Sequence, residues 1–299
     1  MKTYQLLIDA AQRYARRHAN SDGLAITPVP GLRMMCLSVP NRKLQSVYRP
    51  LVCLVLQGRK QLLVGHQQQL CTAGESVIVS ADMPVLGQVV EASATVPYVA
   101  LAIELDMALL QELADEQASS RVRSSASNVV FMQNIDEIIL DCSTRLMRLI
   151  DRPDAIPVLL PGIMKELHFW LLDGPNGEQL RALAAADSYP NRLRRAIAIL
   201  RAEFQQRIPV ERLAQAAAMG VTAFHKHFKE LTSLTPGQYQ KRLRLIEARR
   251  LMLYQGSTAS NAAYAVGYES VPHFTRDYRQ MFGAPPAQDI RNTERLAHG

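Results

Sequence analysis

The sequence predicts an α+β protein of two domains, with a strand-rich first domain and an all-helical second domain. Three observations lead to this prediction. The chain has 299 residues, which is enough for two domains that each bury a core of their own. Short apolar segments separated by turn signals occupy residues 30–106, and apolar residues at helical spacing follow from there onward.

The strand-rich region contains five segments that are rich in Val, Leu and Ile. Gly58-Arg59 and Gly65-His66 suit tight hairpins, and Ala73-Gly74-Glu75 suits a turn. Several short strands at this spacing suggest a meander that closes into a barrel or a sandwich, and we expect a cupin-like β-barrel. The expected strands are Leu32–Val39, Leu51–Gln57, Gln61–Val64, Ser76–Ser80 and Tyr98–Leu105.

Three helices are expected after the strands, over Met107–Asp115, Ile135–Asp151 and Pro157–Leu172. The second has a broad apolar stripe, which would bury against the barrel or against a second copy of the chain. Both alternatives stay open, and we expect a homodimer that pairs through this helix. The segment Asp187-Ser188-Tyr189-Pro190-Asn191 breaks the helical pattern, so we place the boundary between domains 1–187 and 188–299 there.

Charge divides unevenly between these two domains. Residues 188–299 carry 17 Lys and Arg against 8 Asp and Glu, a net charge of +9, whereas residues 1–187 carry 17 against 19, a net charge of −2. This asymmetry indicates a polyanionic partner for the second domain alone. No apolar run approaches the ~18 residues that span a bilayer, and the first 20 residues do not resemble a signal peptide. We therefore expect a cytoplasmic protein with no membrane partner.

The second domain contains the residue spacing of a helix-turn-helix motif. Such a motif needs a small residue where its helices cross, a permissive residue four positions later, and an apolar residue six positions beyond that. Ala214, Ala218 and Phe224 have this spacing, and Gly220 suits the N-cap of the second helix. Six helices are expected in this domain: Arg192–Gln206, Val210–Ala218, Thr222–Leu231, Pro236–Tyr254, Ala259–Val266 and Ser270–Phe282.

The same spacing recurs about 50 residues later. Ala263 and Gly267 repeat the crossing and turn positions, and Phe274 repeats the apolar position after a turn that is one residue longer. Ser270 can cap the second helix of this repeat. A plain six-helix bundle would have the same core, but both second helices expose cationic and imidazole side chains that could reach bases or phosphates. The repeat therefore favours two DNA-binding units.

These residues resemble the AraC/XylS family of transcription regulators over about Asn191 to Arg291. The segments that carry the resemblance are "VERLAQAAAMGVTAFHKHFKELTSLTPGQYQKRLRLIEARRLML" and "NAAYAVGYESVPHFTRDYRQMFGAPP". The N-terminal segments "LVCLVLQGRKQLLVG" and "EASATVPYVALAIELD" look like the AraC-type N-terminal domain of a subgroup that includes regulators of aldehyde reductases. The family often has Gly where Ala218 stands and Ser where Gly220 stands, and both replacements are compatible with the fold.

The resemblance implies a sequence-specific regulator whose second helices enter two adjacent major grooves of double-stranded operator DNA. It implies an effector-sensing and dimerisation domain before the DNA-binding domain, a small-molecule effector, a contact with RNA polymerase, and activation of transcription. The family's base-contacting positions fall on Thr222, His225 and Lys226 in the first unit and on Val271, His273 and Arg276 in the second. We expect phosphate contacts from Lys229 and Arg279.

Lys226 and Arg276 occupy matching positions in this arrangement. Each follows a core aromatic residue, Phe224 or Phe274, by two positions, which is about 200° around a helix. Both side chains should therefore point away from the core and towards DNA. Val271 can offer only an apolar contact, such as one to a thymine methyl group.

An enzyme built on the predicted barrel is the alternative class of function. Such an enzyme would need clustered metal ligands, and the barrel region has a single histidine, His66, at an expected hairpin tip. No phosphate-binding or nucleophile motif is present, so we assign no catalytic residue, metal or cofactor. Arg59, Lys60 and Glu91 are polar candidates near an apolar interior, and we expect each at the surface.

Two further alternatives concern thiols and DNA architecture. Cys36, Cys53, Cys71 and Cys142 have no metal-ligand spacing and are expected to be free, mostly buried thiols. A redox or electrophile-sensing role stays open for them. A non-specific protein that coats or bends DNA would hold phosphates alone and would need no sensing domain. Binding to unrelated DNA distinguishes this class from a sequence-specific regulator.

Overall fold

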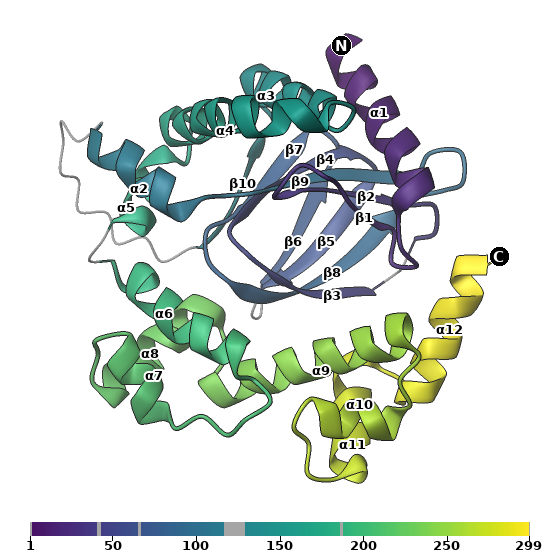
Figure 1. The fold of residues 1–299 in the computed structure, drawn as a ribbon, viewed down its shortest axis with the longest axis vertical. Helices are drawn as coiled ribbons and strands as arrows, with labels where there is room; N and C mark the ends of the chain where they lie inside the picture. Colours follow the sequence, from purple (N-terminus) through teal and green to yellow (C-terminus); the bar gives the residue numbers. More distant parts are fainter. Residues whose placement is uncertain (1, 41–42, 65–66, 117–128, 186–187, 299) are drawn as a thin grey trace. The chain divides into compact units, whose positions relative to one another are not determined.

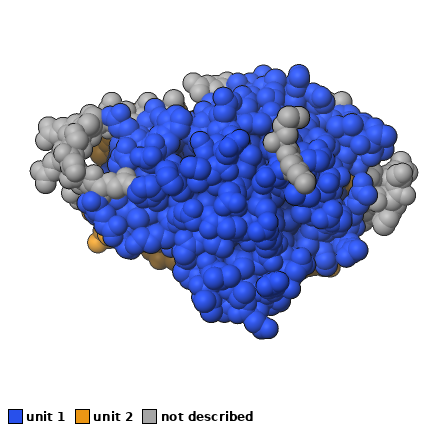
Figure 2. All heavy atoms as spheres, turned by 90° about the horizontal axis from the view of Figure 1, so that it is seen from above, with its two compact units in different colours: residues 1–44, 48–191 blue, residues 45–47, 192–299 orange. Residues whose placement is uncertain are grey.

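The computed structural model describes residues 2–40, 43–64, 67–116, 129–185 and 188–298. The chain forms two compact units, which Figure 2 shows in different colours. Unit 1 comprises residues 1–44 and 48–191, and unit 2 comprises residues 45–47 and 192–299. The boundary predicted at Asp187 lies outside the described residues, and the separate roles assigned to the two domains stay predictions.

Unit 1 contains two β-sheets (Figure 1), whose strand orders in the described residues are β1-β2-β9-β4-β7-β10 and β3-β8-β5-β6. The six-stranded sheet consists of β1 (Leu24–Ile26), β2 (Leu32–Leu37), β4 (Leu51–Gln57), β7 (Glu75–Val79), β9 (Tyr98–Glu104) and β10 (Val130–Asn134). The four-stranded sheet consists of β3 (Lys43–Tyr48), β5 (Arg59–Val64), β6 (Gln67–Thr72) and β8 (Met83–Glu91).

The predicted α+β class is confirmed, but the strands do not form a closed barrel. β4 pairs with β7 and β9, while β5 pairs with β6 and β8. Gly58-Arg59 therefore crosses from one sheet to the other, and the hairpin predicted there is wrong. Gly58 has φ +78°, and a Cβ would lie 2.5 Å from the carbonyl oxygen of Glu91, so this crossing requires glycine. The second predicted hairpin, Gly65-His66, lies outside the described residues.

The burial of strand β4 on both faces explains why its sequence does not alternate between apolar and polar residues. All residues from Leu51 to Leu56 are buried. One face of the six-stranded sheet packs against helices, and the other faces the second sheet, as Figure 1 shows. A strand covered on both faces has a continuous apolar sequence.

Five helices accompany the sheets of unit 1: α1 (Lys2–His18), α2 (Met107–Glu116), α3 (Glu137–Leu149), α4 (Ile156–Asp173) and α5 (Gly177–Ala184). A single-turn helix, η1 (Pro153–Ala155), precedes α4. In α3 the apolar stripe, which includes Ile139, Cys142 and Leu146, is buried and packs against α1 and α4. The stripe is therefore covered by two helices of unit 1, whereas the sequence offered the barrel or a second copy of the chain as its cover.

Helix α4 is strongly apolar. With the preceding turn, Pro153–Asp173 is long and apolar enough to cross a membrane by length and composition alone, with a mean hydropathy of 1.3. The charged Lys165 and Glu166 divide this segment, in agreement with the expectation that no uninterrupted apolar run approaches the ~18 residues that span a bilayer. One side of α4 packs against α2, α3 and α5, while much of its other side is exposed.

His168 joins α4 to the start of α2. Its Nε2 atom accepts a hydrogen bond from the backbone N–H of Asp106 at 2.8 Å, and its Nδ1 lies 2.6 Å from the carbonyl oxygen of Met164. Both ring nitrogens are satisfied when the neutral ring carries its proton on Nδ1. Burial lowers the pKa of His168, which also favours this neutral form.

Unit 2 contains helices α6 (Tyr189–Ala202), α7 (Val210–Ala216), α8 (Val221–Thr232), α9 (Pro236–Gln255), α10 (Ala259–Ala265), α11 (Val271–Phe282) and α12 (Pro286–His298). The first residues of α6 fall within unit 1. Six of these helices match the predicted ones closely, and α12 was not predicted. Asp289 of α12 accepts hydrogen bonds from Tyr278 of α11 at 2.9 Å and Arg249 of α9 at 2.8 Å. This pair of contacts fixes α12 against the second helix-turn-helix unit.

The first helix-turn-helix unit is formed by α7 and α8. Ala214 is buried where the two helices meet, and Phe224 and Phe228 are fully buried on the inner face of α8. The Phe228 ring packs edge-on against Tyr239 of α9, with ring centroids 5.5 Å apart. The aromatic spacing predicted from the sequence therefore anchors α8 to α9.

The second unit, formed by α10 and α11, repeats this packing. Ala263 is fully buried at the crossing, and Phe274 and Tyr278 are fully buried on the inner face of α11. Leu245, Ala248 and Met252 of α9 belong to the same core cluster. Both units thus pack on α9.

The turns of the two units have the same backbone conformation and different residues. Ala218 has φ +51° and Gly267 has φ +86°. The left-handed conformation costs an alanine roughly 1 kcal/mol and a glycine almost nothing. A Cβ on Gly267 would also lie 2.0 Å from the carbonyl oxygen of Gln205, so the second turn has no space for any side chain.

Arg244 of α9 binds both the second turn and the loop after α6. Its guanidinium donates hydrogen bonds to the carbonyl oxygens of Phe204 at 2.6 Å, Gln205 at 3.0 Å, Gln206 at 3.1 Å and Gly267 at 2.8 Å. Four backbone acceptors at one planar donor group fix the loop, the turn and α9 in a single arrangement. We refer to this set of contacts as the Arg244 junction.

The two turns predict opposite effects of exchanging glycine and alanine. Ala218→Gly should raise the free energy of unfolding by up to about 1 kcal/mol, because it relieves the left-handed alanine. Gly267→Ala should lower it by at least about 2 kcal/mol, because it adds both backbone strain and the contact with Gln205. Urea unfolding of the full chain, followed by circular dichroism, measures both changes.

Gly237→Ala provides the matched control. Gly237 is exposed in the first turn of α9, and nothing lies within 4 Å of its Cβ position, so this change should not destabilise the protein. A Gly267→Ala variant as stable as the unmodified protein would contradict the close contact with Gln205.

Candidate DNA-binding surface

The outward face of α8 carries the residues predicted to contact DNA from the first unit. Thr222, His225 and Lys226 are exposed, and so is Lys229 one turn further along the helix. Their position follows from the burial of Phe224 and Phe228, which turns the opposite side of the helix to solvent. Gly220 occupies the N-cap position, as predicted. Whether these side chains contact bases or phosphates stays a prediction.

The outward face of α11 carries the corresponding residues of the second unit. His273, Arg276 and Arg279 are exposed, and 70% of the Arg276 side chain is accessible. Val271 is half-buried at the start of the helix and packs partly against the core cluster. This packing limits Val271 to a small contact with a partner.

The capping role predicted for Ser270 is only half right. Ser270 is the N-cap residue of α11, but its side chain makes no capping hydrogen bond. Pro272 in the first turn removes one backbone donor from this end of the helix. The cap therefore depends on backbone conformation and not on the serine hydroxyl.

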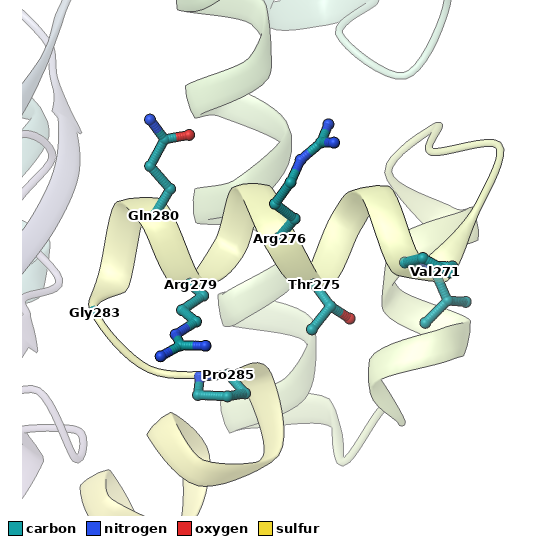
Figure 3. Close-up of a pocket in the computed structure, with 8 residues that line it drawn as sticks. Val271, Thr275, Arg276, Arg279, Gln280, Gly283 and Pro285 are labelled. Carbon is teal, nitrogen blue, oxygen red and sulfur yellow. The ribbon is translucent and has the colours of Figure 1, made fainter.

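Aligning the units by their core aromatic residues identifies a residue that the sequence analysis missed. Phe274 corresponds to Phe224, so Arg276 corresponds to Lys226 and Thr275 corresponds to His225. Figure 3 shows Arg276 and Gln280 projecting from one side of α11, with Thr275 and Arg279 on the other. Phe224 and Phe274 are 50 residues apart, and so are Phe228 and Tyr278. Adding 50 to the number of each candidate residue of α8 would have pointed to Thr275 from the sequence.

These side chains line a hollow of about 770 Å³ along α11 (Figure 3). The hollow combines two guanidinium groups with a hydroxyl and an amide, which are the donors and acceptors that read base edges and hold phosphates. Its lining residues are Val271, Pro272, Thr275, Arg276, Arg279, Gln280, Gly283 and Pro285.

Acidic side chains near the two helices are occupied by other contacts. Asp277 lies 3.5 Å from Lys241 of α9 and 3.8 Å from Arg276, and it accepts a hydrogen bond from Tyr268 at 3.4 Å. His227 of α8 is paired with Glu230 at 2.9 Å. Within the described part of the chain, Lys226, Lys229 and Arg279 have no ion pair with an acidic side chain. Their charges are available to a polyanion.

Curated relatives match the C-terminal part of the chain. The HTH-type transcriptional activator RhaS of Escherichia fergusonii is 32% identical over 97 residues, which cover 32% of this chain and 35% of RhaS. RhaS of Citrobacter koseri is 33% identical over 100 residues, which cover 33% of this chain and 36% of RhaS. The chain thus spans about a third of the length of these relatives.

Solved structures of ToxT match nearly the whole chain in fold. ToxT from Vibrio cholerae O395 bound to (E)-4-(8-methylnaphthalen-1-yl)but-3-enoic acid gives a TM-score of 0.59 at 9% identity, covering 89% of this chain and 99% of that chain. Wild-type ToxT from strain SCE256 bound to an unsaturated fatty acid gives 0.55 at 9% identity, covering 87% and 94%. At this identity the likeness concerns the fold alone.

Two family models match the chain in sequence order. The model of the AraC-type transcriptional regulator N-terminus matches residues 28–179, which is more than half of the chain, and the helix-turn-helix domain model matches residues 213–292. The predicted family is confirmed, while the narrower resemblance to the subgroup with regulators of aldehyde reductases stays a prediction. The chain belongs to the family of AraC-type transcriptional regulators.

Proposed function

We propose that this protein is an effector-responsive transcription activator that binds double-stranded operator DNA through α8 and α11. One observation carries the proposal: two helix-turn-helix units, packed on the same helix α9, each present a second helix with a basic outward face. The family model and the name of the RhaS relatives, a transcriptional activator, support the same function. A regulator of this kind acts in the cytoplasm, where operator DNA lies.

The second helices supply the base contacts of the proposed complex. Because both units pack on α9, the two helices would enter adjacent major grooves, about one turn of DNA apart. Arg276 can donate two hydrogen bonds to guanine O6 and N7, and Thr275 is added to the contacts predicted from the sequence. The proposed base-contacting residues are Thr222, His225, Lys226, Val271, His273, Thr275 and Arg276, and the proposed phosphate-contacting residues are Lys229 and Arg279.

Unit 1 is the proposed sensing domain. It shares its fold with ToxT, which has been solved with an unsaturated fatty acid and with a butenoic acid derivative bound. A small-molecule effector held by unit 1 would alter DNA binding or the contact with RNA polymerase. No catalytic role is proposed, since the helix-turn-helix family model and the RhaS relatives point to a transcription regulator.

We further propose that unit 1 forms a homodimer through the outward face of α4. The stripe of α3 that the sequence favoured is buried within the unit, whereas α4 exposes Val158 at 76% and Leu159 at 50%. Phe169, three turns further along, is also exposed, and Gly162 lies between them with open space around it. An exposed apolar helix face with a glycine at its centre suits close approach of a second copy of the helix.

Pairing through α4 predicts the behaviour of a charge substitution. The intact protein should sediment as a dimer at micromolar concentration, and Val158→Asp should convert it to a folded monomer because a charge would be buried at the contact. Ile138→Asp, on the outward side of α3, is the matched control and should leave the dimer intact. If the unmodified protein sediments as a monomer, the proposed dimer is excluded. If the Val158→Asp variant remains a dimer, the dimer contact does not lie on the outward face of α4.

Base reading and phosphate holding predict different effects of two substitutions. Arg276→Ala should weaken binding to the operator by about 1–3 kcal/mol, with little change in binding to random DNA, because it removes a base contact. Lys229→Ala should weaken binding to both DNAs similarly and reduce the salt slope by about one unit, because it removes a phosphate contact. Salt titrations with both DNAs, on an operator found by genome-wide mapping of bound sites, measure these effects.

Each variant is the matched control for the other, because both remove one exposed positive charge from a helix that is proposed to face DNA. If Arg276→Ala lowers the affinity for both DNAs by the same factor, Arg276 holds a phosphate and the assignment of α11 as a base-reading helix fails. An unmodified protein that binds random DNA as tightly as the operator would instead indicate the non-specific architectural class.

A further inference from the structure

Lys60 lies in the interior of unit 1, although the sequence analysis expected it at the surface. It belongs to β5, opposite Cys71 on β6 and Val89 on β8, and only 4% of the residue is exposed. The preceding residue, Arg59, and its partner on β8, Glu91, lie at the surface, where they form an ion pair at 2.8 Å. The strand alternation that turns Arg59 outward turns Lys60 towards the six-stranded sheet.

Three side chains, those of Tyr48, Cys53 and Cys71, lie near the Lys60 ammonium group, and Tyr98 interacts with all three; we call these five residues together the Lys60 cluster. Tyr48 at the end of β3 accepts a hydrogen bond from Nζ at 2.7 Å, and its ring lies 5.5 Å from the same atom. Cys53 on β4 and Cys71 on β6 are close enough to affect the protonation of Lys60. The fifth member, Tyr98 on β9, interacts electrostatically with Tyr48, Cys53 and Cys71.

Two polar groups of the cluster lack the partners that burial demands. An ammonium group has three donors, and Tyr48 is the single hydrogen-bond acceptor that the described residues provide to Nζ. No acidic side chain among the described residues pairs with Lys60. Tyr98 is fully buried, and its hydroxyl group has no hydrogen-bond partner. Buried charges and hydroxyl groups without partners are costly, and they mark sites where a ligand can supply the partner.

Lys60 is the one cationic side chain of the cluster. Burial raises the pKa of Cys53, of Tyr98 and of Cys71, the last to about 12, so these groups stay neutral. Burial works to lower the pKa of Lys60, and the hydrogen bond that Nζ donates to the Tyr48 oxygen works to raise it. The cluster therefore places one amino group among neutral side chains.

Small residues on the neighbouring strands accommodate the Lys60 side chain between the sheets. A Cβ on Gly87 of β8 would lie 2.6 Å from Cε and 3.3 Å from Nζ of Lys60, so glycine makes room for this side chain. On the facing sheet, Ala100 and Ala102 pair with Val55 and Cys53 and share their inner face. Ala102 is partly accessible to solvent, whereas Ala100 is buried.

We propose that the Lys60 cluster binds the carboxylate of a small, otherwise apolar organic acid, which is the effector class of unit 1. Lys60 would form the ion pair, and Tyr98 and Tyr48 would donate hydrogen bonds from their hydroxyl groups. One ammonium group and two hydroxyl groups balance a single negative charge, whereas a phosphate would bring nearly two. The apolar remainder of the acid would lie against the alanines of β9 and the cysteines. This inference rests on the proposed function of unit 1 as a sensing domain.

A matched set of probes tests the carboxylate directly. Hexanoate, octanoate, benzoate and cinnamate are titrated into the full-length protein by calorimetry, beside the amide of each acid, hexanal and inorganic phosphate. At least one acid should bind with a submillimolar dissociation constant and at least tenfold more tightly than its amide. Equal binding of an acid and its amide, preferential binding of hexanal or phosphate, or no binding of any acid at millimolar concentration would overturn the proposal.

Two variants locate the binding in the Lys60 cluster. Lys60→Met keeps the length of the side chain and should reduce acid affinity at least tenfold without lowering thermal stability, because it removes a buried charge that has no acidic partner. Tyr98→Phe should reduce the affinity roughly threefold to tenfold, at no cost in stability, because the lost hydroxyl has no partner in the free protein. Arg59→Met removes a neighbouring exposed cation and should change neither quantity.

Further measurements distinguish the absence of a binding site at Lys60 from a folding defect and from a failure of the proposed regulatory function. Circular dichroism establishes that each variant is folded, and a carboxylate should shift the lysine ¹³Cε resonance that disappears in Lys60→Met. Operator binding by the ligand-free variants should equal that of the unmodified protein. If the unmodified protein binds no operator, the proposed function fails independently of this site; if Lys60→Met binds the acid unchanged, the Lys60 assignment fails alone.

Discussion

The Arg244 junction holds together the helical unit that is proposed to bind DNA. A single guanidinium group holds the carbonyl oxygens of Phe204, Gln205 and Gln206 together with that of Gly267. These contacts join the loop after α6 and the second turn to α9, the helix on which both α8 and α11 pack. Gly267 can approach the loop closely only because it has no side chain. The junction thus helps to hold the second unit on α9, and the packing of both units on α9 sets the spacing between α8 and α11.

The helical unit could be predicted from the sequence because its determinants are local. Small residues at the crossings, permissive residues at the turns and aromatic residues six or seven positions later fix each helix-turn-helix unit within about 20 residues of chain. Helix α12 was missed because it is held by a long-range network, in which Tyr278 and Arg249 converge on Asp289. Thr275 was not among the candidates because the offset between the two units was applied to the core aromatic residues and not to the positions between them.

Unit 1 was harder to predict because its pairing is non-local. A run such as Leu51–Leu56 does not reveal which strand lies beside it, and Gly58 looks the same in a hairpin as in a crossing between sheets. The position of Lys60 depends on this difference, since the residue is buried only because β5 faces the other sheet. A charged residue one position from an exposed ion pair gives no sign of burial in the sequence. The proposed effector site therefore became visible only in three dimensions, whereas the proposed DNA-binding residues could be listed beforehand.

In the proposed complex, α8 and α11 of one subunit bind one operator at a fixed spacing. The most direct test uses the half of the operator that one subunit contacts. About five base pairs, which is half a helical turn, are inserted between the two major-groove segments, and the affinity of the protein for this DNA is measured. We predict that the insertion reduces the affinity to that for random DNA, because the packing of both units on α9 prevents the second helix from following its groove to the opposite side of the duplex. An affinity unchanged by the insertion would contradict the claim.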